Sequence, residues 1–288
     1  RMLQQTFNGG QIQSRELDGL TFTLGRLEHV KGRGSSNEMG MSIPGANNPQ
    51  TGEFVNKFYY GGVDYKASKD LTLQYYYGGL EDFYKQNFLG LKYDLPVGPG
   101  TLRTDLRFFD NRADGANGHD PAYYTFGYYG DGVTKGKVDS RLSSAQFTYL
   151  IHGHTLAAGL QQVSGKSDAV WLNQGDGSTA YFMTESMIGK FQRAGETTWQ
   201  VKYGYDFAGL GVPGLTFMGM YESGSNIRTP TGDKHEWERN LTVSYVVQQG
   251  PLKDLSIALR HASLRTEVST QRDSDEHRVI VSYPLNIL

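Results

Sequence analysis

Five basic residues lie at alternate positions of segments whose other positions are mostly apolar: Arg103, Arg107, Lys202, Arg260 and Arg278. The segment before Arg260 shows the pattern, because Ile257 and Leu259 alternate with Ala258 and Arg260. A charge that faced the middle of a bilayer would cost about 2–4 kcal/mol. If these segments are membrane strands, the five cations must therefore face a water-filled lumen. Fixed positive charge on such a wall attracts anions, so the pattern predicts that the lumen binds anions.

Other patterns that could carry chemistry are weak. His152 and His154 flank a glycine in a tight turn, with no third metal ligand in view. The chain has no G-x-S-x-G elbow, and Gly32-Arg33-Gly34 is not followed by a helix that could hold a phosphate. We therefore expect no metal, no cofactor and no enzymatic activity. A net charge of −2 without dense basic runs gives no reason to expect nucleic acid as a partner.

The positioning elements are strands. The last segment, 278–288, places apolar or aromatic residues at every odd position from Val279 to Ile287. The same alternation recurs along the chain in stretches of about ten residues, which is typical of a transmembrane β-barrel with a polar interior. No apolar run approaches the ~18 residues of a membrane helix. Glycine, at 37 of 288 residues, is well above its usual share of about 7% and indicates many turns. The absence of cysteine suits an oxidising compartment.

We predict thirteen strands, at 8–17, 20–30, 54–66, 70–80, 84–95, 100–110, 139–151, 154–164, 196–207, 214–224, 237–248, 253–264 and 276–287. Long connections are expected at 31–53, 111–138, 165–195, 225–236 and 265–275, with short turns at the other rim; residues 81–83 are a short exception. Bacterial barrels sort their connections in this way, with the long loops outside. A large soluble sheet with one wet face is the alternative. Tyrosines near the strand ends disfavour it, because they resemble interfacial girdles.

Several blocks of sequence resemble the OprD-type substrate-specific porins of Pseudomonas and its relatives. They are LQQTF at 3–7, LEDFYKQ at 80–86, GVPGLTFM at 211–218, YVVQQGPLKDLS at 245–256 and RVIVSYPL at 278–285. The resemblance implies an all-β fold, an antiparallel transmembrane barrel of 18 strands. Residues 1–288 would form one barrel domain that supplies strands 6 to 18. An odd strand count and about 22 residues per strand agree that an N-terminal part is missing.

The resemblance also implies passive, selective uptake of small carboxylates, aromatic or other monocarboxylates, across the bacterial outer membrane. Members of the family line the pore with a basic ladder. Arg260 and Arg278 match ladder positions, and Lys202, Arg103, Arg107 and Lys92 fit the same face by alternation. Guanidinium groups pass a carboxylate along by bidentate hydrogen bonds. We expect Asp94, Asp105 and Asp206 to pair with these bases or orient them. A structural mesh of salt bridges is the alternative.

Two inward loops narrow the pore in this family. One would end near residues 2–5, and the other should be 165–195. The second is rich in aromatic and hydroxyl groups, and we expect Asp176, Ser178 and Tyr181 near the solute path and Trp171 and Phe182 packed inside. A connection of this length without secondary structure is usually functional or disordered, and its aromatic content argues against disorder. A plain surface loop is the alternative.

Two other functions stay open. Lumen acids could bind the ammonium end of a basic amino acid, which would make the pore a basic amino-acid channel of the same family. A structural or adhesive barrel would instead display its long loops to partners. The direction of 165–195 discriminates, because an inward loop makes a filter and an outward loop a display. Outer-membrane lipid and lipopolysaccharide are the expected surroundings, and the protein is expected to be a monomer or a weak oligomer.

Overall fold

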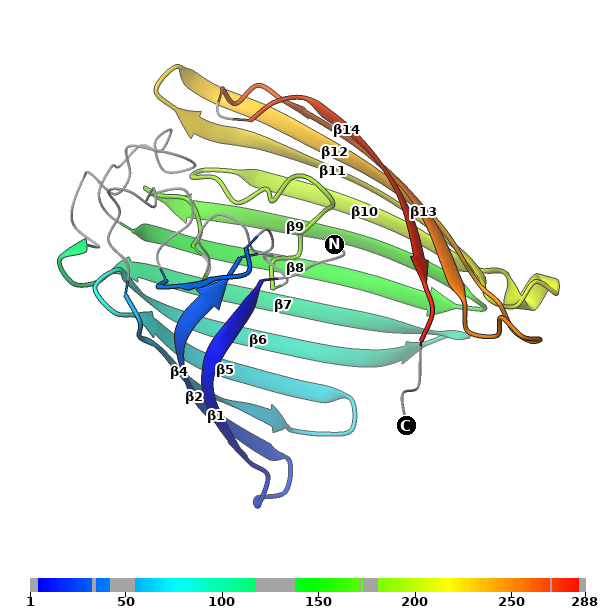
Figure 1. Ribbon diagram of the computed structural model, residues 1–288, viewed down its shortest axis with the longest axis horizontal. Helices are drawn as coiled ribbons and strands as arrows, with labels where there is room; N and C mark the ends of the chain where they lie inside the picture. The colour runs from blue at the N-terminus through cyan, green and yellow to red at the C-terminus, as the bar shows by residue number, and fades with distance from the viewer. Residues whose placement is uncertain are drawn as a thin grey trace.

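A computed structural model describes residues 5–32, 35–41, 55–117, 138–170, 172, 181–269 and 271–284. These form one antiparallel sheet (Figure 1) in which each long strand pairs with the next along the chain. The strands are β1 (Thr6–Ser14), β2 (Leu20–Lys31), β3 (Glu38–Met39), β4 (Phe58–Lys66), β5 (Leu71–Leu80), β6 (Tyr84–Val97), β7 (Gly100–Ala113), β8 (Asp139–Ile151), β9 (His154–Gly165), β10 (Thr197–Asp206), β11 (Leu215–Thr229), β12 (Gly232–Val246), β13 (Ser256–Thr266) and β14 (Ser274–Ser282). No helix among the described residues is long and apolar enough to cross a membrane.

The predicted antiparallel all-β fold is confirmed, with a long strand at each of the thirteen predicted places. The structure adds the two-residue strand β3, which pairs with β2 inside the predicted connection 31–53. The predicted connection 225–236 is wrong, since β11 and β12 continue to a tight turn at 230–231. A register shift after Gly224 and a positive φ at Asn226 break the alternation there, which made strand look like loop.

Short turns join the strands at one rim, the right and lower side of Figure 1. Gly19, Gly98 and Gly153 take positive φ in three of these turns. A fourth contains the 3₁₀ helix η4 (Phe207–Leu210), whose first turn is capped by the Asp206 carboxylate, which accepts a hydrogen bond from the Ala208 N–H at 2.9 Å. Tight turns of this kind fix strand register, because a slip of one residue would exchange the two faces of the sheet.

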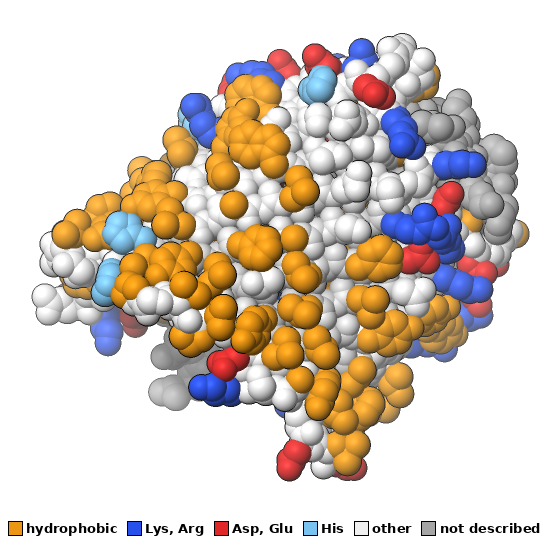
Figure 2. All heavy atoms as spheres, turned by 180° about the vertical axis from the view of Figure 1, so that it is seen from behind, with side chains coloured by type: hydrophobic (Ala, Val, Ile, Leu, Met, Phe, Trp, Pro, Cys, Tyr) orange, Lys and Arg blue, Asp and Glu red, His pale blue; other side chains and the backbone are white. Residues whose placement is uncertain are grey.

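The two faces of the sheet differ as the alternation predicts. The outer face carries exposed apolar side chains: Ile12 is 75%, Leu24 65% and Val279 69% exposed. Figure 2 shows this face from behind, with a broad apolar band over the strands and charged side chains gathered toward one end. The sheet curves, and its concave inner face receives residues of the connection between β9 and β10 (Figure 1).

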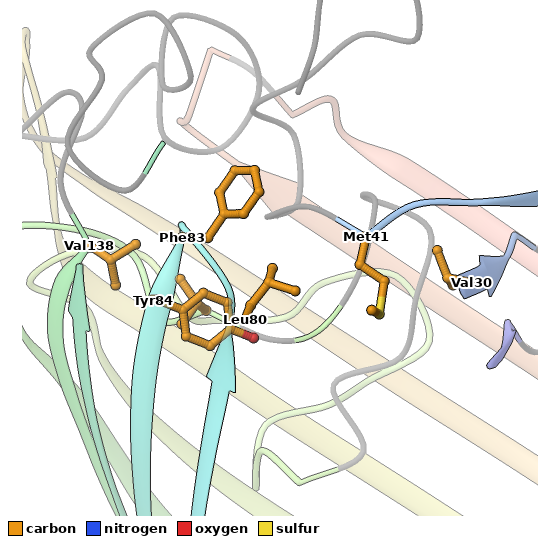
Figure 3. Close-up of a cluster of buried hydrophobic side chains, with 7 residues drawn as sticks. Val30, Met41, Leu80, Phe83, Tyr84 and Val138 are labelled. Carbon is orange, nitrogen blue, oxygen red and sulfur yellow. The ribbon is translucent and has the colours of Figure 1, made fainter. Parts of the chain in front are cut away.

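Two clusters of buried apolar side chains lie on the inner face of the sheet. The first joins Val30, Met41, Leu80, Phe83, Tyr84, Val138 and Val170 (Figure 3). The second joins Phe88, Phe109, Leu142, Val163, Ala169 and Phe182. Each cluster contains a residue of the β9–β10 connection, Val170 or Phe182, so apolar burial fastens this connection to the wall.

Candidate functional site

The β9–β10 connection lies on the inner wall. Arg107 of β7 donates from Nη1 to the Tyr181 carbonyl at 2.6 Å. Gln161 of β9 donates to Thr184 Oγ1 at 2.8 Å and to the Phe191 carbonyl at 2.7 Å. These wall residues belong to the phase opposite the apolar outer face. The prediction that 165–195 packs inward is therefore confirmed for its described residues. Trp171, Asp176 and Ser178 lie outside the described residues.

We call residues 181–193 of this connection the inward segment. One carboxylate holds its middle in place. Glu238 of β12 is fully buried and accepts five hydrogen bonds, one from Asn240 Nδ2 on its own strand and four from the inward segment. The four donors of the segment are Ser186 Oγ at 2.8 Å and the backbone N–H groups of Met187 and Ile188 at 3.0 Å and Gly189 at 2.5 Å. Backbone N–H groups that converge on a carboxylate form strong charge-assisted bonds. These bonds attach the inward segment to the inner face of β12, two strands along the sheet from β10, which follows the segment in sequence.

Aromatic contacts hold the other end of the inward segment. Tyr181 packs its ring edge-on against Phe88 at 5.8 Å between centroids, and Phe182 packs edge-on against Phe109 at 5.7 Å. Tyr181 remains 62% exposed, so its ring faces the open space above the wall. Gly159 of β9 makes room for this segment, since a Cβ there would collide with the Met183 sulfur.

A cavity of about 460 Å³ lies between the inward segment and the wall. It is lined by Glu185, Ser186, Met187, Lys202, Met218, Met220, Asn240, Thr242, Arg260 and Arg278. Three of the predicted site residues, Lys202, Arg260 and Arg278, therefore meet at one place although they come from β10, β13 and β14. The structure does not bring Arg103, Arg107, Lys92 or Tyr181 to this cavity.

The three cations of the cavity differ in their partners. Arg278 lies opposite Arg260 in the β13–β14 pairing. It holds Glu276 through Nε and Nη2 at 2.5 and 2.6 Å, and Nη2 also donates to the Met187 carbonyl at 3.2 Å. Arg260 and Lys202 form no ion pair within the described part of the chain, and the buried Arg260 Nε has no hydrogen-bond partner there. Two cations thus remain available to an anionic solute.

The two predicted arginines of β7 are engaged instead. Arg103 binds Asp94 through two hydrogen bonds of 2.8 Å, and Arg107 binds Asp105 through bonds of 2.8 and 2.7 Å. Lys92 lies opposite Asp105 in register. The expected pairing of Asp94 and Asp105 with bases is confirmed. For Asp206 the structure shows a helix cap in place of a base, because the residue lies where the strand bends into η4.

Sequence reasoning missed the buried acids beside the inward segment. Glu222 of β11 is fully buried and accepts from Gln200 Nε2 at 2.6 Å. Glu196, just before β10, accepts from the Arg193 N–H at 2.9 Å. Burial and then the neighbouring Glu236 carboxylate raise the pKa of Glu196 well above its usual range. Alternation could have identified them, because Glu222, Glu236 and Glu238 occupy inward-facing positions of their strands, as the cations do on neighbouring strands.

The described residues hold no group of three or more His, Cys, Asp or Glu side chains placed for a metal ion. His154, one of the two histidines of the predicted pair, packs at a tilt against Tyr205 with 4.4 Å between ring centroids, and its Nδ1 lies 2.9 Å from the Tyr203 hydroxyl. Both tyrosines belong to the outer phase of β10. This histidine therefore belongs to an aromatic cluster at the short-turn rim.

Comparison with known proteins adds independent information. A family model described as outer membrane porin, OprD family, matches residues 1–287. The porin-like protein GalP of Pseudomonas putida is 30% identical over 289 residues, a match that covers 100% of this chain and 64% of GalP. The chain thus spans less than two thirds of the length of that relative.

Solved structures match the fold closely. The crystal structure of Pseudomonas aeruginosa OccK8 (OprE) has a TM-score of 0.93 and 52% identity, and the match covers 100% of this chain and 72% of that one. Pseudomonas aeruginosa OpdK, solved with vanillate, has a TM-score of 0.86 and 36% identity over 99% of this chain and 70% of that one.

Proposed function

We propose, since the chain belongs to the OprD family of outer membrane porins, that its protein is a passive channel for small organic anions and that the cavity beside the inward segment selects them. The family places the protein in the bacterial outer membrane, and its relatives are channels rather than enzymes. The favoured solutes are monocarboxylates with an aromatic or other apolar part.

One observation carries the proposal: Lys202, Arg260 and Arg278 reach a single cavity from three strands. A carboxylate is recognised best by such groups, because Arg offers two parallel N–H donors and Lys a mobile point charge. Several moderate contacts also suit a channel, since the solute must leave again. Arg278, held by Glu276, would orient the solute, and Lys202 and Arg260 would supply the uncompensated charge.

The cavity also offers an apolar side. Met187, Met218 and Met220 line it, and Met218 and Met220 lie beside Thr242 and Asn240, their register partners on β12. Methionine is flexible and polarisable and makes favourable contacts with aromatic rings. Vanillate, with which the structure of OpdK was solved, is an aromatic carboxylate. The charge and the methionines of this cavity fit the same chemical class.

The alternatives receive less support. A basic amino-acid channel needs a pore in which acids outweigh bases, but Asp94 and Asp105 are held by Arg103 and Arg107, and Glu185 shares the cavity with three cations. A display barrel would turn its β9–β10 connection outward, whereas the described inward segment lies on the inner wall. We also propose that residues 1–288 form one barrel domain and that the complete barrel has 18 strands.

Uptake into proteoliposomes tests the function. The full-length protein, reconstituted into vesicles, should admit labelled vanillate and benzoate faster than labelled arginine and faster than an uncharged aromatic of equal size. Vesicles without protein set the background. Equal rates for carboxylates and uncharged solutes would refute charge-based selection, and faster uptake of arginine would favour the basic amino-acid channel.

A further inference from the structure

The outer face carries a groove that the transport proposal leaves unused. It has a volume of about 660 Å³ and crosses six strands, from Leu102 on β7 to Arg239 and Leu241 on β12. At a spacing of about 4.8 Å between neighbouring strands it extends about 24 Å. Its lining is almost wholly apolar.

Strand register explains the groove. Leu156, Tyr203, Gly219 and Leu241 are paired in one row across β9 to β12. Ala158, Val201, Tyr221 and Arg239 form the next row. Small residues between bulky aromatic ones leave a channel along the pairing direction, and Gly219 forms part of its floor. A Cβ on Gly219 would meet only side chains, Phe217 at 3.3 Å and Leu241 at 3.6 Å, so a larger residue there would enter the groove.

The groove ends at a cation. Arg239 is exposed, belongs to the outer phase of β12 and forms no ion pair within the described residues. The carboxylate two strands away, Asp275, is already held by Arg265 at 2.9 Å. A lone cation on a lipid-facing surface needs an anion, because its charge would otherwise be costly near hydrocarbon.

Aromatic side chains fix the height of Arg239 in the membrane. Tyr221, its register partner, packs between Trp199 at 5.4 Å and Trp237 at 5.8 Å. Tryptophan and tyrosine gather at the headgroup level of membranes. Arg239 is the middle residue of β12, and Trp237 lies two residues farther from the short-turn end of that strand. Short turns of bacterial barrels face the periplasm, so the tryptophans lie on the outer-leaflet side of Arg239. Arg239 therefore lies just inside this aromatic row, from where its long side chain can extend to the headgroups of the outer leaflet.

We propose that this groove binds lipopolysaccharide, with an acyl chain along the apolar floor and a lipid A phosphate on Arg239. An amphiphile with an anionic head in the outer leaflet matches the order of features along the groove, apolar first and cationic last. Arg donates to phosphate through two parallel N–H groups, which gives both strength and orientation. The site faces away from the solute path, so it stands or falls independently of the transported substrate.

Binding of purified lipopolysaccharide to the full-length protein in detergent, followed by native mass spectrometry, tests the site. The wild type should retain lipopolysaccharide, whereas Arg239→Gln should weaken retention roughly tenfold, the effect of one charge-assisted hydrogen bond. Arg239→Lys should restore part of it. Gly219→Leu should reduce retention by filling the groove. Arg26→Gln is the matched control, because Arg26 lies on the same face but is paired with Glu28 at 3.0 Å.

Three outcomes would overturn the proposal. Equal retention by Arg239→Gln and Arg26→Gln would exclude a role for the cation. Equal binding of dephosphorylated lipopolysaccharide to the wild type would exclude phosphate recognition. Full competition by phosphatidylglycerol would show a general anionic-lipid surface in place of a lipopolysaccharide site. Unchanged single-channel conductance and β-sheet circular dichroism verify that each variant is folded.

Discussion

Two stretches of the inner wall carry cations at the same phase of the alternation, yet they present different charge. On β6 and β7, Arg103 and Arg107 are each held by an aspartate through two hydrogen bonds. On β10 and β13, Lys202 and Arg260 have no ion pair within the described residues, and they share a cavity. The first stretch is a salt-bridge mesh and the second is an open cationic wall. Alternation decides which face a base takes, but its neighbours decide whether its charge reaches the solute.

Removal of the anchor of the inward segment should have the largest effect. Glu238→Ala deletes four hydrogen bonds to residues 186–189, at a local cost on the order of 3 kcal/mol. The segment should then leave the cationic wall, and single-channel conductance should rise while discrimination among carboxylates falls. Glu28→Gln, which removes an exposed acid of the outer face, is the control and should leave conductance unchanged. An unaltered conductance in folded Glu238→Ala would show that this segment does not narrow the path.

The open cationic wall should bind carboxylates, and the mesh should not. Lys202→Met keeps the stem of the side chain but removes the charge, so block of ion current by vanillate should require a roughly tenfold higher concentration. Lys92→Met removes a lysine of β6 that lies opposite Asp105 and outside the cavity, so it should shift the blocking concentration little. Titration of single channels with vanillate measures both. A shift of equal size in the two variants would erase the distinction between the walls.

The preference of the channel for anions should depend more on the open cationic wall than on the mesh. Arg260→Ala should lower the anion-to-cation permeability ratio roughly two- to threefold at low salt, and the effect should shrink as ionic strength rises. Arg103→Ala should change the ratio less, because it removes an arginine already neutralised by Asp94. Reversal potentials across a salt gradient give the ratios. An Arg260→Ala channel with wild-type selectivity at low salt would show that this residue is not part of a ladder.

The sequence predicted the faces of the sheet better than the contacts upon them. The phase of Lys202, Arg260 and Arg278 followed from apolar alternation, and tight turns at glycine keep that phase in register. These three residues line one cavity because the sheet is curved and the inward segment packs against it. Neither feature can be predicted from the alternation of apolar residues. Glu238 was not singled out, because its role depends on N–H groups about fifty residues away that become neighbours only after folding.

The continuation of β11 and β12 beyond 224 was missed for a local reason. A bulge after Gly224 exchanges the phases, so a polar stretch between two strands looked like a loop. Alternation is informative only where register is regular. The pairing of Asp94 with Arg103, by contrast, was within reach of the sequence, because the two residues lie opposite each other across the short turn at 98–99.

The smallest predicted effect comes from freeing one arginine of the salt-bridge mesh, so that it resembles the cations of the open wall. Asp94→Asn leaves the size of the side chain and removes the charge that neutralises Arg103. Both partners are substantially exposed, and exposed pairs contribute only about 0–1 kcal/mol, so the barrel should stay folded. The released guanidinium should raise anion preference by less than twofold, because Arg103 lies outside the cavity and the inward segment does not press solutes against it. The double variant Asp94→Asn with Arg103→Ala should return to the wild-type permeability ratio. If Asp94→Asn instead leaves the ratio unchanged while Arg260→Ala lowers it, position within the narrow cavity, rather than pairing, determines which cations select the solute.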